Sequence, residues 1–77
     1  MHEARRRIAA CNVQPDLIDT MHGVFDDVWQ RSATKTDAVA GAIADALCGL
    51  ARAGQKSSER LTVYAQSKAF EAGRLSH

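Results

Sequence analysis

Apolar side chains recur every three or four residues between residues 16 and 31, which is the spacing of an amphipathic helix. On a helical wheel they fall within an arc of about 160°, and polar residues occupy the opposite side. The apolar positions are Leu17, Ile18, Met21, Val24, Phe25, Val28 and Trp29. Pro15 suits the first turn, where its missing N–H costs nothing, and Asp16 favours the positive end of the helix dipole. The pattern predicts a helix over residues 16–31.

A second helix is predicted from about Asp37 to Ala53, after a linker over residues 32–36. Thr34 and Asp37 fit a capping pattern, with Thr36 as the competing cap, and Gly54 is a suitable left-handed stop. A coiled-coil-like seam recurs with spacing 3-4-3 at Ala40, Ile43, Leu47 and Leu50. The far side of this helix carries small residues instead of the usual charged ones. Glycine lowers helix propensity, so we interpret this side as a place for close backbone approach.

A third helix is predicted from Ser57 or Ser58 to about Ala72, and Gly73 is expected to end it. One apolar face consists of Leu61, Tyr64, Ala65, Ala69 and Ala72. Val63 and Phe70, a heptad apart, lie almost opposite that face. A helix with apolar groups on two sides either contacts two neighbours or exposes a patch to a partner.

The predicted fold class is all-α: a small antiparallel bundle of three main helices, since short connections imply antiparallel neighbours. His2 to Cys11 is compatible with a short amino-terminal helix. We expect one helical domain over residues 1–77, with a loosely attached arm over residues 1–13 as the alternative state of that end. The expected core is Leu17, Ile18, Met21, Val24, Phe25, Val28, Trp29, Val39, Ile43, Leu47, Leu50, Leu61 and Tyr64.

Composition and charge narrow the class of protein. The 77 residues suffice for one small domain, and 25% charged residues with 45% hydrophobic ones argue against a disordered tail. Ten Lys and Arg against nine Asp and Glu give a net charge of +1, whereas a dedicated nucleic-acid-binding domain is normally clearly basic. The chain has no apolar run of the ~20 residues that a membrane span needs, and no signal-peptide pattern. We therefore expect a cytoplasmic protein.

No catalytic motif is present: there is no phosphate loop, nucleophile elbow, His-Glu-x-x-His or Cys-x-x-Cys sequence. We expect no catalysis, no cofactor and no metal. His22 and Asp26 lie one turn apart, which we interpret as a hydrogen-bonded pair, with half a metal site or an acid/base pair as the alternative. Cys11 and Cys48 are interpreted as small buried apolar groups, or as redox partners if the amino-terminal segment docks on the second helix.

Residues 15–65 resemble a set of small, uncharacterised bacterial all-helical proteins. An aromatic first helix precedes an Ala/Leu helix that glycine closes, and a leucine follows. The residues that carry the likeness are Pro15, Ile18, Met21, Phe25, Trp29, Ala44, Ala51, Gly54 and Leu61. The resemblance implies a compact helical fold and no assigned activity.

We therefore expect a helical interaction module that forms a homodimer or binds a helical protein. The expected interface is Ala38, Gly41, Ala42, Gly49, Val63 and Phe70. The alternative is a nucleic-acid-binding or regulatory helical protein, which the charge balance makes the weaker interpretation. Its contact residues would be Arg5, Arg6, Arg7, Lys56, Arg60, Lys68 and Arg74.

Overall fold

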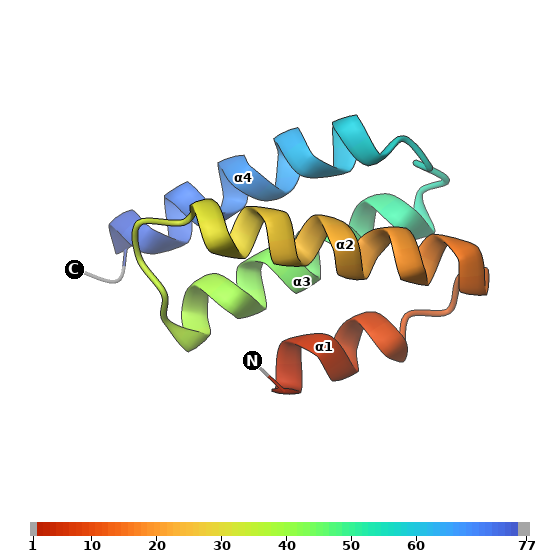
Figure 1. Ribbon diagram of the computed structural model, residues 1–77, viewed down its shortest axis with the longest axis horizontal. Helices are drawn as coiled ribbons and strands as arrows, with labels where there is room; N and C mark the ends of the chain where they lie inside the picture. The colour runs from red at the N-terminus through yellow and green to blue at the C-terminus, as the bar shows by residue number, and fades with distance from the viewer. Residues whose placement is uncertain (1, 76–77) are drawn as a thin grey trace.

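A computed structural model of the chain describes residues 2–75, which form four helices and contain no strand. The helices are α1 (His2–Ala9), α2 (Pro15–Arg31), α3 (Asp37–Arg52) and α4 (Ser58–Leu75). In Figure 1, α4 lies along one edge, α1 along the opposite edge, and α2 and α3 lie between them. The all-helical class, with three main helices and a short amino-terminal one, is therefore confirmed.

Local chemistry explains where the helices begin and end. Pro15 occupies the first position of α2, and the Thr36 hydroxyl caps α3 by accepting a hydrogen bond from the Val39 N–H at 3.3 Å. Thr36, the competing cap, is thus the one used. Gly54 adopts φ 96° just after α3, a left-handed conformation that favours glycine. The Ser57 hydroxyl accepts from the Arg60 N–H at 3.4 Å and starts α4.

The expected end of the last helix is wrong, because α4 continues through Gly73 to Leu75. Gly73 is buried, and a Cβ atom added to it would lie 3.3 Å from Thr34 Oγ1. The glycine therefore allows α4 to approach the α2–α3 connection closely, instead of ending the helix.

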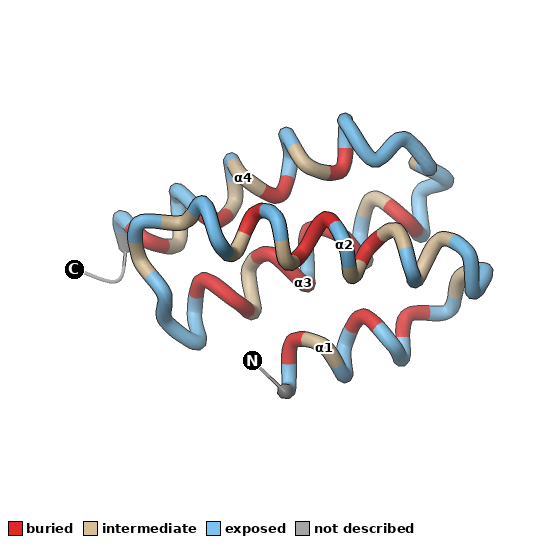
Figure 2. Tube along the Cα trace, in the orientation of Figure 1, coloured by how far each residue is buried: buried red, intermediate tan, exposed pale blue. Residues whose placement is uncertain are grey.

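The core gathers inward-facing residues of all four helices (Figure 2). Phe25, Met21, Ile43, Leu47 and Leu61 have no exposed surface. Four expected core residues, Leu17, Ile18, Trp29 and Leu50, are only partly buried and pack against its margin. The expectation that Tyr64 belongs to the core is wrong: Tyr64 is exposed, and α4 contributes Leu61, Ala65 and Ala69 to the core. The buried residues that the expected core did not include are Ala4, Ile8, Cys11, Ala40, Ala44, Ala46, Ala51, Ala65 and Ala69.

The amino-terminal segment is packed against the bundle and is not a loosely attached arm. Ala4, Ile8 and Cys11 are buried, and α1 contacts both α2 and α3. Ion pairs reinforce both contacts: Arg5 binds the Asp26 carboxylate on α2, and Arg7 reaches α3. The apolar face of a fourth helix is thus buried, and this adds to the limited surface that so small a domain can bury on folding.

Candidate functional site

The large exposed hydrophobic side chains of residues 3–74 all belong to α4. Val63 is 64% exposed, Phe70 68% and Tyr64 40%. At 100° per residue, Val63 and Phe70 lie about 20° apart on the helix, whereas Tyr64 lies about 100° or more from both. We call the surface formed by Val63 and Phe70 the outer face of α4. The sequence pattern singles out both residues, and the structure leaves both mostly exposed.

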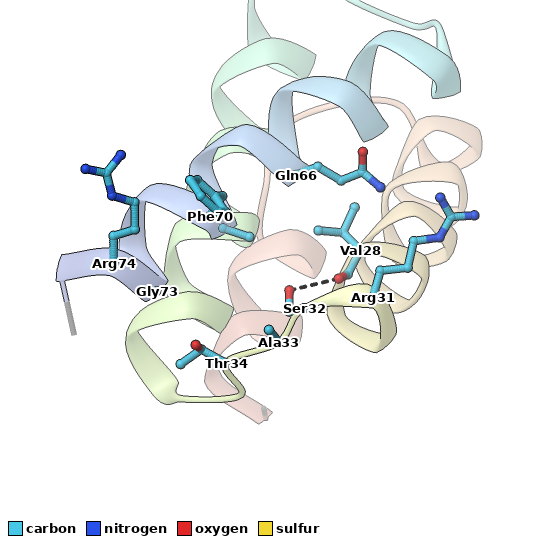
Figure 3. A pocket seen from close by; sticks show the side chains of 10 residues that line it. Val28, Arg31, Ser32, Ala33, Thr34, Gln66, Phe70, Gly73 and Arg74 are labelled. Carbon is cyan, nitrogen blue, oxygen red and sulfur yellow. Dashed lines mark hydrogen bonds between the residues drawn. The ribbon is translucent and has the colours of Figure 1, made fainter. Parts of the chain in front are cut away.

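Phe70 also forms one wall of a groove between α4, the end of α2 and the α2–α3 connection (Figure 3). The groove has a volume of about 430 Å³. Val28 and Ala69 contribute apolar surface to it, and the guanidinium groups of Arg31 and Arg74 lie on opposite sides of it. None of the described residues that line it is acidic. Arg31 is paired with Asp27 at 3.2 Å, so the groove combines an apolar surface with the positive charge of Arg74.

Cations accompany both exposed aromatic rings of α4. The guanidinium of Arg74 lies 5.9 Å from the centre of the Phe70 ring, and the ammonium of Lys68 lies 5.4 Å from that of Tyr64. Such exposed cation–π contacts contribute about 0.5–1 kcal/mol. Lys68 is also paired with Glu71 at 3.5 Å. At the end of the outer face of α4, the Arg74 guanidinium therefore lies beside Phe70, the largest apolar side chain of that face.

The small residues of α3 do not join this surface. Ala38 and Gly49 are exposed, while Gly41 and Ala42 are half-buried. A Cβ atom added to Gly41 would lie 3.5 Å from the Arg7 guanidinium, so α1 covers that glycine. Within the described chain α1 and α4 share no contact. The six expected interface residues therefore divide between two regions of the molecule.

The expected nucleic-acid residues are also divided. Arg5 pairs with Asp26 and its guanidinium lies 5.7 Å from the centre of the Phe25 ring, and Arg7 pairs with Asp45 at 3.1 Å. Two of the three consecutive arginines are thus neutralised by carboxylates. The remaining members belong to α1, to the α3–α4 connection and to α4: Arg6, Lys56, Arg60, Lys68 and Arg74. Because α1 and α4 lie at opposite edges of the bundle, the structure does not bring the set together (Figure 1).

The two cysteines meet where α1 packs on α3. The Cys48 thiol donates to the Arg7 carbonyl at 3.5 Å, and the Cys11 thiol donates to the Cys48 carbonyl at 3.9 Å. Burial and the neighbouring Cys11 raise the pKa of the Cys48 thiol from 9.0 to about 12. A thiol that stays protonated is a poor nucleophile, so this geometry favours a packing role for the pair over a redox role.

The expected hydrogen bond between His22 and Asp26 is wrong. The Asp26 carboxylate is taken by Arg5, and the buried His22 Nδ1 has no hydrogen-bond partner in the described chain. Residues 2–75 contain no group of three or more His, Cys, Asp or Glu side chains that could hold a metal ion. His22 therefore lies at the margin of the core with one unsatisfied nitrogen.

Sequence reasoning missed the groove because its parts are distant in the sequence. Arg31, Ala33 and Gly73 meet only when α4 packs on the end of α2. The close approach at Gly73 was the available signal, but a glycine near a predicted helix end is read first as a stop.

Comparison with protein-family models, with curated proteins and with solved structures found no match to the chain. None of the helices within residues 2–75 has the length and apolar character needed to cross a membrane.

Proposed function

We propose that the chain is a small cytoplasmic interaction module, without catalysis of its own, that self-associates through the outer face of α4. The observation that supports the proposal is the exposure of Val63 and Phe70 side by side on one helix. Burying a side chain of this size contributes about 1.5–3 kcal/mol, and a two-fold dimer buries each one twice. The α3 surface would contribute less binding free energy, because Ala38 and Gly49 have little apolar area to bury.

Two helices, α2 and α3, hold α4 in place. We infer that α2, α3 and α4 are antiparallel neighbours, because connections as short as residues 32–36 and 53–57 favour that arrangement. In this arrangement the inner face of α4, with Leu61, Ala65 and Ala69, is anchored in the core. Its outer face is then presented on a rigid support, which lowers the entropy cost of binding.

Replacement of Phe70 by serine tests the proposal. Phe70→Ser removes two aromatic side chains from each dimer and should raise its dissociation constant more than a hundredfold, from about 3 kcal/mol of lost apolar burial. The matched control is Tyr64→Ser, which removes an exposed aromatic ring from another side of the same helix. Size-exclusion chromatography with light scattering gives the mass of each variant.

The proposal predicts that Phe70→Ser is monomeric at concentrations where the unmodified chain and Tyr64→Ser are dimeric. Equal masses for all three proteins would contradict it. Circular dichroism should show the same helicity in each, because both substituted side chains are exposed.

A further inference from the structure

Four residues of α4 form one stripe along its exposed side: Glu59, Val63, Phe70 and Arg74. Glu59 lies one turn before Val63, and Arg74 lies one turn after Phe70. At 100° per residue the four positions span an arc of only about 60°. The midpoint between Val63 and Phe70 falls between residues 66 and 67, and the midpoint between Glu59 and Arg74 falls at the same place.

A shared midpoint has a consequence for symmetric pairing. In a two-fold dimer with antiparallel α4 helices, the axis passes through one point of the helix, and each residue faces the residue equally far on the other side. With the axis between residues 66 and 67, Phe70 packs on Val63 of the second copy. The same axis brings Arg74 to Glu59 of the second copy. One register therefore satisfies the apolar pair and the charged pair together.

A parallel pairing lacks this complementarity. It would bring Glu59 next to Glu59 of the second copy and Arg74 next to Arg74, and like charges in such positions are destabilising. The antiparallel register replaces both repulsions by two attractions. The charges of the stripe thus select one of the two symmetric arrangements.

Both charged ends of the stripe are available for a second copy. Glu59 is exposed and makes no ion pair within residues 2–75, and neither does Arg74, whose described interaction is with the Phe70 ring. Arg74 also borders the groove beside Phe70, and the described lining holds no carboxylate. Arg31, on the other side of the groove, is already paired with Asp27 at 3.2 Å, so Arg74 is the arginine of the lining that a partner carboxylate would meet. The groove is consequently suited to an apolar side chain that comes with a carboxylate one turn away.

We propose, resting on the proposed self-association, that two copies pair their α4 helices antiparallel in this register. Val63 of each copy then packs against Phe70 at the groove of the other, and Glu59 pairs with Arg74. The occupant of the groove is thus a second copy of the chain, and each dimer contains two equivalent Val63–Phe70 contacts and two equivalent ion pairs.

Charge reversal by Glu59→Arg and by Arg74→Glu tests the register. Alone, each variant turns both ion pairs of its dimer into like-charge contacts, so we expect its dissociation constant to rise about tenfold or more. Mixed, the two variants form a heterodimer in which both contacts join opposite charges again. Sedimentation velocity should therefore show weakened association for each variant alone and restored dimer for the mixture.

Lys68→Glu is the matched control, because it makes the same charge change on α4 about 150° away from the stripe. Mixed with Glu59→Arg, it should not restore the dimer, which separates a specific register from general attraction between oppositely charged chains. Helicity by circular dichroism checks that each variant is folded.

The outcomes distinguish the register from the function. Dimers that ignore the charge reversals, or that the mixture fails to restore, would overturn the register and leave self-association standing. An unmodified chain that stays monomeric would overturn the proposed function and the register with it.

Discussion

At the scale of single residues, the Cys48 thiol shows how the packing of α1 changes chemistry. The pKa of about 12, against 9.0 for an unperturbed thiol, lowers the thiolate fraction at pH 8 about a thousandfold. We therefore expect iodoacetamide to modify Cys48 far more slowly in the folded protein than in guanidinium chloride. Mass spectrometry of the alkylated protein measures both rates, and similar rates would show that the thiol ionises normally in the fold.

The sign of the linked stability effect follows from the same shift. A pKa raised on folding means that the protonated thiol is the form the fold favours, so its contribution is fully present below the unfolded pKa of 9.0. That contribution is lost as the pH rises from 9.0 towards about 12. The contact of α1 with α3 should thus be insensitive to this group at neutral pH and weaken only in strongly alkaline solution.

At the scale of helices, replacing Gly49 of α3 and Gly73 of α4 by alanine should change the free energy of unfolding differently. Nothing lies within 4 Å of a Cβ atom added to Gly49, so Gly49→Ala should raise the free energy of unfolding by about 1 kcal/mol through helix propensity alone. Gly73→Ala should give no such gain, because its Cβ meets Thr34 at 3.3 Å. Thermal denaturation should show a Tm about 4–8 °C higher for Gly49→Ala.

The Gly49→Ala result also bears on which surface associates. If α3 helices approached one another closely through Gly49, the added methyl group would weaken the dimer. With the interface on α4, the variant should keep the mass of the unmodified chain. A loss of dimer in Gly49→Ala would move the interface to α3.

The spacing of apolar residues predicted the helices well because the buried face of each helix is formed by a pattern within its own segment. The bounds of α2 and α3 follow from Pro15, Thr36 and Gly54, which act through the backbone of their own segments. The end of α4 could not be predicted in this way, since Gly73 is determined by its contact with Thr34. The same limit applies to α1, because Ile8 is buried only through the contacts of α1 with α2 and α3.

The residues of the candidate site also form two groups: those that a local sequence pattern identifies, and those that only the fold brings together. Val63 and Phe70 were identified from the sequence because two apolar residues opposite an apolar face stand out on a helical wheel. The groove beside Phe70 was not identified, because Arg31 reaches it from another helix. The small residues of α3 were grouped with Val63 and Phe70 by composition, and the fold separates them by placing α1 over Gly41.

At the scale of the whole molecule, charge is arranged for internal pairing more than for binding a polyanion. Arg5 and Arg7 attach α1 to the acidic residues Asp26 and Asp45, and the basic residues of α4 lie at the opposite edge. Binding to phosphates requires several unpaired cations on one surface. The fold therefore gives less support to the nucleic-acid alternative than to self-association.

Sedimentation equilibrium of the unmodified chain is the most direct test of self-association. The chain has a mass of 8.3 kDa, so a concentration series at micromolar levels should show the average mass rising towards twice that value. The rise should persist at high salt, because most of the interface is apolar and salt screens only the ion pairs. A mass that stays at 8.3 kDa throughout the series would contradict the account.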